Sequence, residues 1–311
     1  MTAPVYVASH LLGGLGNQLF QYAAGRALAS RLGANLILDA TAFRVGYCQR
    51  PFELDHYPIG ATVAWRGFGK GPRKRHVPLP DNATPAERTL RLIGSVIAGR
   101  VDHGIRRPRL AVFIQKGFDY DPQFEQLTGS TYLAGYWQSY RYFEPAAGTI
   151  RRELQLPSAP GSANRDWLER IGATNSVCLH VRRGDYLLSR ELQIHGLCSL
   201  SYYEKAMRRI AEQVRGAEFF LFSDDHPWCR ENFRGDNIHF VDANGPNAAV
   251  EDLRLMAACR HHVIANSSLS WWAAWLADHP GHLAIAPDPW FAHLASTPDL
   301  LPKRWLTLPR I

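Results

Sequence analysis

The stretch "VYVASHLLGGLGNQLFQYAAGRALASRLGANLILD" (residues 5–39) decides the fold of the N-terminal part of the chain. Its first five residues read as a buried strand, and "NLILD" (35–39) reads as a second one. Between them, apolar residues recur at helical spacing, and Gly33 follows Arg31 where the helix should end. A strand, a helix and a strand in this order form a βαβ unit, which implies a parallel sheet.

Three glycines, Gly13, Gly14 and Gly16, lie between this strand and this helix, and the amides Asn17 and Gln18 follow at once. Glycine lets the backbone take positive φ and lets another group approach closely. The spacing does not fit a dinucleotide-binding fingerprint, since a leucine occupies the third glycine position, and no Walker Gly-Lys-Ser/Thr occurs. The loop therefore indicates a close approach by a group that neither motif identifies.

Length and composition indicate two domains of ordinary size, each able to bury a substantial core. The chain has 311 residues, of which 46% are hydrophobic, and no apolar run reaches the length of a membrane span. The first ten residues have neither the basic start nor the apolar core of a signal peptide. The five cysteines are scattered without CxxC spacing, which argues against a metal cluster or a disulfide framework. We expect a protein of the reducing cytoplasm.

The net charge of +7 is concentrated in residues 66–109, which hold eleven Lys/Arg and three acids. Such a patch could meet an anionic membrane surface, a pyrophosphate-linked lipid or nucleic acid. A solvated loop and helix face is an equally open alternative. Thr84 begins a capping box in this segment, which predicts a helix start there.

The second half of the chain has the regular alternation of an α/β sheet. The Pro-, Ser- and Gly-rich stretch 154–166 is the predicted linker, and we expect one domain over 1–160 and another over 161–311. Beyond the linker, helical patterns separate five predicted strands, at 176–181, 218–222, 237–241, 261–265 and 282–286. Polar motifs follow the carboxyl ends of these strands, which is the edge where open α/β sheets bind ligands.

The motif "LHVRRGDY" (179–186) carries His180, Arg182, Arg183 and Asp185 at the end of a strand. Two adjacent guanidiniums suit a phosphate, because arginine donates two parallel hydrogen bonds to phosphate oxygens. For Arg183 we expect instead an internal ion pair with Asp185. The side chain of Arg182 should face the other way on an extended backbone and is the better phosphate ligand.

Two further motifs follow strands in the same half. In "ANSSLSWW" (265–272) three serines stand where a strand becomes a helix, so they either cap the helix or help its N-terminus bind phosphate. In "FSDDHP" (222–227), Asp224 and Asp225 either cap the next helix or accept hydrogen bonds from guanine or from a ribose hydroxyl. The tryptophans at 271, 272 and 275 have helical spacing and are predicted to be core.

Asp119 and Asp121 match the DxD spacing of metal-dependent sugar transferases. They lie in "FDYDPQF" (118–124), which is typical of a turn. The turn is the preferred interpretation, and no metal is expected.

Taken together, these motifs resemble a known series. "GGLGNQLFQYAAGRAL", "GYWQSYRYF" (135–143), "HVRRGDY", "HGLCSLSYY" (195–203), "FSDD" and "NSSLSWWAAWL" are similar, in order, to the motifs of the bacterial α-1,2-fucosyltransferases, glycosyltransferase family 11. The H-x-R-R-x-D core is shared with α-1,6- and protein O-fucosyltransferases. The resemblance therefore identifies the donor better than the acceptor.

This resemblance implies a GT-B fold, in which two Rossmann-like domains face each other across a cleft. The N-terminal domain would take the acceptor and the C-terminal domain GDP-fucose. The implied reaction is an inverting transfer of L-fucose from GDP-β-L-fucose to the 2-hydroxyl of a galactoside, in glycan or surface polysaccharide synthesis. The implied partners are GDP-fucose and a galactose-containing glycan, without nucleic acid and without a metal cofactor. A peripheral contact with the anionic inner face of the bacterial membrane is compatible with the basic segment.

The resemblance also implies roles for single residues. The loop glycines would let the backbone lie against the sugar-diphosphate, and Asn17 would reach the reacting sugar or the leaving phosphate. Arg182 would hold the β-phosphate. The remaining implied donor-binding residues are Gly14, Gly16, His180, Ser223, Asp224, Asp225, Ser267, Ser268 and Ser270.

The catalytic base is the least defined role. His195 lies on the loop after "HVRRGDY", and imidazole titrates in the useful range. Glu191 is the second candidate, a structural role for His195 at the Gly196 turn is open, and the departing phosphate could itself take the proton. Other functions also stay open: another fucosyl linkage, a nucleotide-sugar sensor, or a basic membrane scaffold that has kept only the fold.

Overall fold

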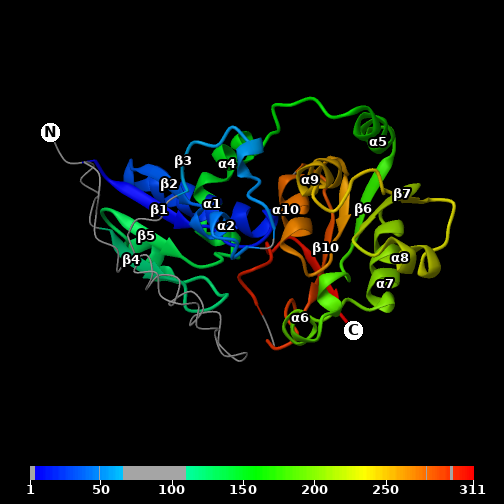
Figure 1. The fold of residues 1–311 in the computed structure, drawn as a ribbon. Coiled ribbons are helices and arrows are strands. Elements are labelled where there is room, and N and C mark those ends of the chain that lie inside the picture. Colours follow the sequence, from blue (N-terminus) through cyan, green and yellow to red (C-terminus); the bar gives the residue numbers. More distant parts are fainter. Residues whose placement is uncertain (1–3, 49, 66–109, 278, 295–296) are drawn as a thin grey trace. The chain divides into compact units, whose positions relative to one another are not determined.

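The computed structural model describes residues 4–48, 50–65, 110–277, 279–294 and 297–311 (Figure 1). It contains two compact units, Met1–Gln155 and Leu156–Ile311. The division falls within the stretch 154–166 that has the composition of a linker, slightly before residue 160. The basic segment 66–109, with the helix start predicted at Thr84, lies outside the described residues.

Unit Met1–Gln155 is built on a five-stranded parallel sheet of order β3-β2-β1-β5-β4. Its strands are β1 (Tyr6–His10), β2 (Asn35–Asp39), β3 (Thr62–Ala64), β4 (Ala111–Ile114) and β5 (Thr131–Ala134). Its helices are α1 (Leu15–Leu32), α2 (Thr41–Arg44) and α4 (Ala147–Glu153), with 3₁₀ turns η1 (Leu54–His56), η2 (Pro122–Gln126), η3 (Tyr140–Tyr142) and η4 (Glu144–Ala146). The βαβ unit predicted over residues 5–39 is confirmed, because β1 and β2 pair in parallel around α1.

Helix α1 follows β1 and holds the neighbouring loops through polar side chains. It ends at Gly33, whose φ of 59° is the left-handed conformation that closes many helices. Two of its amides are fully buried, and both tie loops together. Gln18 Nε2 donates to the carbonyls of Gly13 (3.0 Å) and Pro51 (2.8 Å). Gln21 accepts from Leu12 N (2.9 Å) and donates to Gly135 O (3.2 Å).

Unit Leu156–Ile311 has a six-stranded parallel sheet of order β11-β10-β9-β6-β7-β8. The strands are β6 (Asn175–Val181), β7 (Ala217–Ser223), β8 (Ile238–Phe240), β9 (His261–Val263), β10 (Ala284–Asp288) and β11 (Leu306–Pro309). The helices are α5 (Ser162–Gly172), α6 (Ser189–Ile194), α7 (Leu200–Ala211), α8 (His226–Asn232), α9 (Ala249–Ala258) and α10 (Ser268–Leu276), with η5 (Asp185–Leu187). The five predicted strands are all present, whereas β11 was not predicted.

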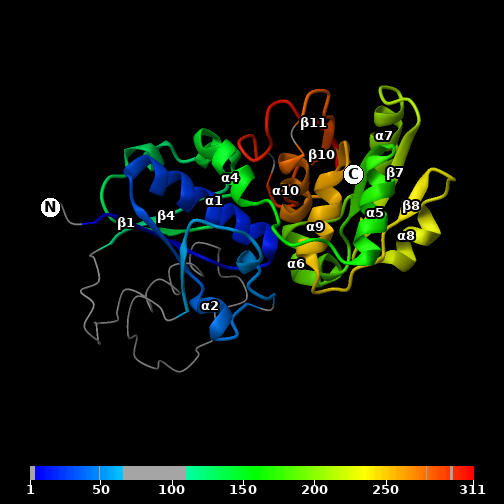
Figure 2. The same ribbon diagram turned by 90° about the horizontal axis from the view of Figure 1, so that it is seen from above.

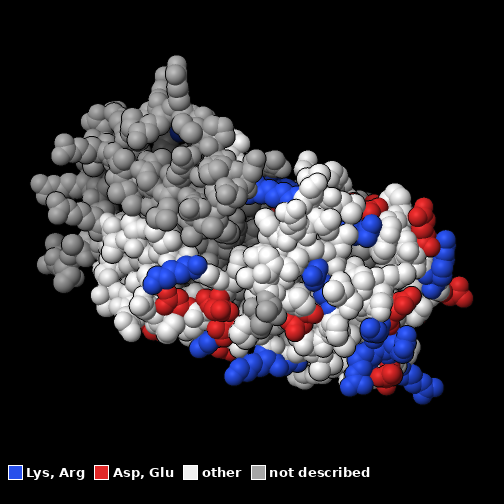
Figure 3. All heavy atoms as spheres, turned by 90° about the horizontal axis from the view of Figure 1, so that it is seen from below, with Lys and Arg blue, Asp and Glu red and all other residues white. Residues whose placement is uncertain are grey.

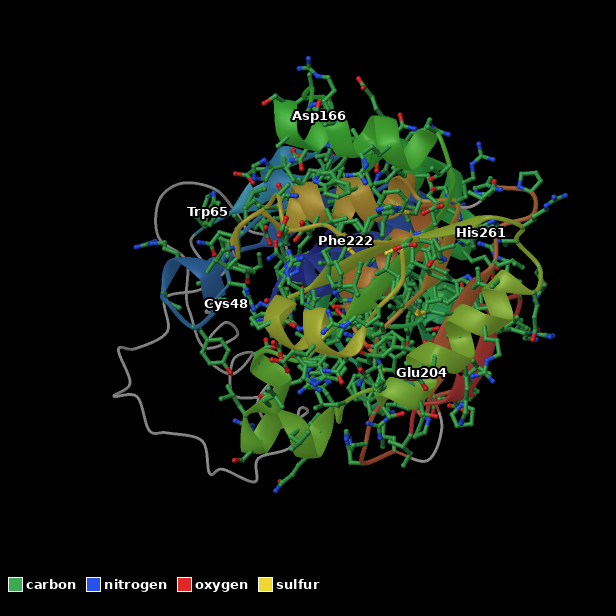
Figure 4. The ribbon with its side chains drawn as sticks, turned by 90° about the vertical axis from the view of Figure 1, so that its right-hand side faces the viewer. Cys48, Trp65, Asp166, Glu204, Phe222 and His261 are labelled. Carbon is green, nitrogen blue, oxygen red and sulfur yellow. The ribbon has the colours of Figure 1, made fainter. Side chains whose placement is uncertain are left out.

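Helices cover both faces of this second sheet (Figures 1 and 2). Helices α7 and α8 form one core with the alternate residues Val177, Leu179 and Val181 of β6. The opposite face of the sheet meets α5, where the ring of Trp167 lies 6.2 Å from that of Phe220. Figure 4 shows Asp166 of α5 and Glu204 of α7 on opposite sides of Phe222 in β7. Each unit is therefore a Rossmann-like layer structure.

The tryptophans of α10 are core, as their spacing predicts. Trp271 and Trp272 are fully buried and Trp275 is nearly so. The rings of Trp271 and Trp272 meet edge to face at 5.3 Å, so they are not a surface platform for a sugar.

Among the described residues, no helix combines the length and the apolar character needed to cross a membrane. Basic and acidic side chains lie interspersed on the described surface that Figure 3 shows.

Candidate functional site

The register of β6 and β7 builds the centre of the candidate site. Val181 pairs with Ser223, the last residues of the two strands. The two chains therefore leave the sheet side by side, and Arg182 and Asp224 are the first residues beyond it. Parallel strands end at one edge, so the polar motifs of this unit gather there.

Arg182 is held between two carboxylates. Its Nη2 lies 2.7 Å from Asp185 Oδ2, and its Nη1 lies 3.1 Å from Asp224 Oδ2. Its side chain is 20% exposed, and Cζ lies 5.5 Å from the ring centre of Tyr186. Burial alone would lower the pKa of Arg182, but the two carboxylates more than offset it and raise that pKa. The guanidinium is therefore a fixed cation at the end of β6.

The predicted ion pair between Arg183 and Asp185 is wrong. Arg183 Nε donates to Asp225 Oδ2 at 3.1 Å, and Cζ lies 3.9 Å above the ring of Trp228. Consecutive residues beyond the strand point to different sides, so Arg183 turns toward the start of α8 while Asp185 is left to Arg182.

The two adjacent aspartates have different surroundings. Asp225 caps α8 by accepting from Trp228 N (3.2 Å), as the capping alternative predicts. With its other oxygen on Arg183, this geometry favours a structural role over a nucleotide contact. Asp224 accepts from Arg183 N (2.9 Å), and burial would raise its pKa, but Arg182 and two backbone N–H groups lower it overall. Ser223 Oγ accepts from Asp225 N (2.9 Å) and so shapes the turn.

Gly184 fits closely against Asp224. A Cβ at this position would lie 2.7 Å from Asp224 Oδ2, which is closer than two such atoms can approach. The glycine of "HVRRGDY" therefore lets the loop fold onto the carboxylate.

His180 is buried one residue before the end of β6. Burial lowers its pKa to about 4, and the neighbouring Arg182 cation adds to the shift. Its Nδ1 is enclosed without a hydrogen-bond partner among the described residues. His180 is therefore a neutral side chain at physiological pH.

The N-terminus of α10 lies at the same sheet edge. Ser267 occupies the cap position in an extended conformation (φ −126°, ψ 130°), and its side chain makes no capping hydrogen bond. Ser268 begins the helix. Ser270 is fully buried, and its hydroxyl lies 3.3 Å from Ala265 O and 3.2 Å from Ser267 O. Ser270 thus shapes the turn, while the first-turn N–H groups lack a serine cap.

Asn266 and Tyr186 tie the loops of this edge together. Tyr186 OH donates to Asn266 O (3.1 Å), which joins the Arg182 loop to the start of α10. Asn266 Nδ2 donates to the carbonyls of His195 (2.8 Å), Gly196 (3.2 Å) and Trp290 (3.1 Å). Sequence reasoning assigned no role to Asn266, because its partners lie far away along the chain.

His195 follows α6 and is packed between aromatic rings. Its ring stacks on Tyr186 (4.5 Å, 8° between planes), and Nε2 lies 3.3 Å from Glu191 Oε2. Its Nδ1 is buried without a partner among the described residues. Burial lowers the pKa of His195, and the Glu191 carboxylate opposes this effect. The two predicted base candidates thus form one pair.

Arg310, near the C-terminus, supports this loop and was not predicted. It is buried, and its Nη1 donates to Leu197 O at 3.1 Å. A Cβ on Gly196, whose φ is 65°, would lie 2.0 Å from the same nitrogen. The Gly196 turn is therefore shaped around the arginine.

The glycine loop of unit Met1–Gln155 differs in part from its prediction. Gly13 has a φ of 78°, so the positive φ that the glycines indicate is present there. Gly14 is the N-cap of α1 with an ordinary φ of −76°, and Gly16 is buried in the first turn. Asn17 Oδ1 accepts from Gln138 Nε2 at 2.8 Å. Gln138 was not predicted as a site residue, although it lies in the motif "GYWQSYRYF".

Glu53 is a second unpredicted group at this loop. Its backbone N donates to Gln18 Oε1 (3.0 Å), and its carboxyl lies at the start of α1, where it accepts from Leu15 N–H. Burial raises the pKa of Glu53 to about 7. It was missed because the sequence around it has no clear pattern.

Asp119 and Asp121 lie in a turn, as preferred from the sequence. Asp121 caps η2 by accepting from Gln123 N (2.9 Å), and the carbonyl of Asp119 accepts from Tyr142 OH (3.3 Å). Within the described ranges, no group of three His, Cys, Asp or Glu side chains is arranged to hold a metal ion.

Comparison with known proteins agrees with this architecture. Residues 121–305 match the model of the family described as Glycosyl transferase family 11. An α-1,2-colitosyltransferase of Escherichia coli is 31% identical over 97% of this chain and 98% of its own. The O-antigen biosynthesis glycosyltransferase WbnK of Escherichia coli is 28% identical over 91% of this chain and 94% of its own.

Among solved structures, the fucosyltransferase NodZ from Bradyrhizobium has a similar fold. It superposes with a TM-score of 0.50 at 17% identity, covering 88% of this chain and 93% of NodZ. The two Rossmann-like units are those of the GT-B fold, and the chain belongs to glycosyltransferase family 11.

Proposed function

We propose that this glycosyltransferase is an inverting α-1,2-fucosyltransferase that moves L-fucose from GDP-β-L-fucose to the 2-hydroxyl of a galactoside. One observation carries the proposal. The fixed cation of Arg182 and the uncapped N-terminus of α10 are joined at one sheet edge through Tyr186 and Asn266. Two positive features of this kind suit a nucleoside diphosphate.

Names of relatives support the sugar and the linkage. Besides the α-1,2-colitosyltransferase, a galactoside α-(1,2)-fucosyltransferase 1 of Bos taurus is 31% identical over 47% of this chain and 43% of its own.

In the proposed reaction the acceptor oxygen attacks carbon 1 of fucose from the face opposite GDP. The bond from carbon 1 to the β-phosphate oxygen breaks, GDP leaves with the electron pair, and the configuration inverts. Arg182 and the N–H groups of Ser267 and Ser268 stabilise the charge that develops on the phosphate. The proton of the acceptor hydroxyl passes to the base, for which the His195–Glu191 pair is the candidate.

We assign the donor to unit Leu156–Ile311 and the acceptor to unit Met1–Gln155. His180 and Asp224 would hold the nucleoside, and Asn17 would face the reacting sugar. No resident metal is needed in this scheme, because the chain's own cation and helix N-terminus meet the leaving group.

Colitosyl transfer is the second candidate, because the E. coli colitosyltransferase aligns with nearly the whole chain. Colitose is L-fucose without its 3-hydroxyl, so the same phosphate site suits either donor. Discrimination would depend on groups that contact the 3-hydroxyl.

A role in surface polysaccharide synthesis is part of the proposal. The relative WbnK is named for O-antigen biosynthesis. We place the reaction at the cytoplasmic face of the membrane, with the basic residues 66–109 as the contact to anionic lipid. Sedimentation with anionic and neutral vesicles at low salt tests this contact, and equal binding to both would contradict it.

The deciding experiment offers purified protein GDP-fucose or GDP-colitose with a panel of galactosides. NMR of the product gives linkage and anomeric configuration, and we expect an α-1,2 product. Another linkage would correct the acceptor assignment. GDP affinity without transfer would favour a sensor, and vesicle binding without nucleotide affinity would favour a scaffold.

A further inference from the structure

Two amide side chains meet at the carboxyl edge of the N-terminal sheet. Asn17 lies in the first turn of α1, after β1, and Gln138 lies in the loop after β5, the neighbour of β1. Gln138 Nε2 donates to Asn17 Oδ1 at 2.8 Å, across 121 residues of sequence. This hydrogen bond sets which end of each amide faces outward.

The loop that carries Gln138 is held in an unusual conformation. Trp137 has a φ of 57°, which is rare for a large residue, and its side chain is fully buried. Gln115 Oε1 accepts from both Tyr136 N (2.9 Å) and Trp137 N (2.8 Å). Strained backbone of this kind persists only where the surroundings determine it, and it clusters at functional sites.

The loop that carries Asn17 is fitted to the same amide. A Cβ on Gly13 would lie 2.6 Å from Asn17 Nδ2, so the glycine leaves the space that the amide occupies. Gln21 braces the two loops, since it accepts from Leu12 N and donates to Gly135 O. The two loops are therefore tied to each other through α1.

Beyond this hydrogen bond, the other end of each amide presents one kind of group. Asn17 presents N–H donors, and Gln138 presents a carbonyl acceptor. Among the described residues, Asn17 Nδ2 and Gln138 Oε1 have no hydrogen-bond partner, and neither atom is fully enclosed, although Gln138 as a whole is only 9% exposed. A hydroxyl both donates and accepts, and it matches this pair. A phosphate oxygen only accepts, and it would meet the carbonyl oxygen of Gln138 unfavourably.

We propose that Asn17 and Gln138 form a subsite for a neutral sugar hydroxyl and not for the leaving phosphate. The proposal rests on the proposed function. It decides between the two roles that the sequence leaves open for Asn17, and it makes Gln138 a substrate-binding residue. The hydroxyl belongs either to the acceptor sugar or to the transferred sugar.

A substrate-variant cycle tests the subsite. Wild-type protein, Gln138→Leu and Gln138→Glu are assayed with monodeoxy galactosides and with GDP-fucose against GDP-colitose. In the wild type, removing the contacted hydroxyl should lower kcat/KM about tenfold, the upper range for one neutral hydrogen bond. In Gln138→Leu the same removal should cost less than twofold. The analogue that responds identifies whether the acceptor or the donor supplies the hydroxyl.

GDP affinity separates a hydroxyl subsite from a phosphate subsite. We expect both Gln138 variants to bind GDP within about twofold of wild type, because no phosphate lies there. Weakening of GDP binding by tenfold or more in Gln138→Glu would overturn the proposal. The proposal would also be overturned if, for every deoxy analogue, kcat/KM fell as much in Gln138→Leu as in the wild type. The exposed Gln123→Leu is the matched control and should behave as wild type.

A failure of the proposed function can be distinguished from a failure of the subsite. If the wild type transfers neither sugar, saturation-transfer NMR with the same deoxy analogues still reports the contact. Binding that discriminates a deoxy analogue in wild type and not in Gln138→Leu would support the subsite. Equal discrimination in both proteins would overturn it. Thermal unfolding of each variant shows that it is folded.

Discussion

Arg182 Nη1 and Asp224 Oδ2 lie 3.1 Å apart at the carboxyl edge of the C-terminal sheet. The contact follows from the pairing of Val181 with Ser223, because Arg182 and Asp224 are the residues that come directly after this pair. With Asp185 on the other side, the guanidinium is held in one orientation before any ligand arrives. Such preorganised donors stabilise developing charge without reorganisation during the reaction.

The first prediction follows from this arrangement. Arg182→Ala should lose at least about a hundredfold in turnover with GDP-fucose, because one preorganised donor is worth that much. Arg182→Lys should recover little, since lysine lacks the fork that contacts two carboxylates and would at the same time contact the proposed phosphate. Steady-state kinetics at saturating acceptor check both. Full activity in Arg182→Lys would refute the role.

Arg183→Lys is the matched control for that experiment. Arg183 contacts Asp225 and the ring of Trp228, not the proposed phosphate site. The variant should lower thermal stability while its GDP affinity stays close to that of wild type.

Gly184→Ala is the second prediction. The added Cβ would lie 2.7 Å from Asp224 Oδ2, so the carboxylate must move and Arg182 loses one of its two partners. We expect GDP affinity, measured by calorimetry, to fall about tenfold, the effect of one charge-assisted hydrogen bond. Gly172→Ala, where nothing lies within 4 Å of the new Cβ, is the control. Equal GDP affinity in both variants would contradict the close fit.

Periodic patterns predicted β1 and β2 of the first sheet and five of the six strands of the second, since buried parallel strands are apolar runs between helical segments. They did not predict β3, β4 and β5, which have only three or four residues each. β11 (Leu306–Pro309) was missed because it is short, ends in proline and is largely exposed. Only its pairing with β10 makes it a strand, and that pairing joins residues far apart in the sequence.

Several candidate site residues could be named from the sequence, but their partners could not. Arg183 and Asp185 are neighbours in sequence, yet the partner of Arg183 is Asp225, which arrives through the register of β6 and β7. Asn17 meets Gln138 for the same kind of reason. Sequence identifies which groups can do chemistry, whereas pairing across a sheet depends on tertiary structure.

The third prediction concerns metals. Asp121 caps η2, so Asp121→Ala should lower the free energy of unfolding by about 0.5–2 kcal/mol, as the loss of a cap does. Turnover below the melting temperature should be nearly unchanged, and EDTA should not slow the wild type. A requirement for Mn²⁺ or Mg²⁺ that Asp121→Ala abolishes would assign this residue to a metal site instead.

The last prediction uses the pair His195 and Glu191 to identify the base. The base form of His195 is the neutral imidazole, so turnover should fall as pH drops through its pKa. Burial lowers that pKa, Glu191 raises it, and nearby His293 lowers it. Glu191→Gln removes an anion that stabilises the imidazolium, so the acidic limb of the kcat/KM profile should move to lower pH. His293→Asn removes a group that opposes protonation, so the limb should move to higher pH.

His195→Ala completes the series, because it should remove the acidic limb altogether and lower turnover by about 10²–10⁴-fold. Its GDP affinity should stay near that of wild type, since Arg182 keeps both carboxylate partners. The two shifts of opposite sign are the sharper evidence: a residue that only packs against Tyr186 and Phe291 would change stability without moving the limb in either direction. If all three variants keep the wild-type profile and rate, His195 is not the base. Proton transfer to the departing phosphate would then be the better account of the reaction.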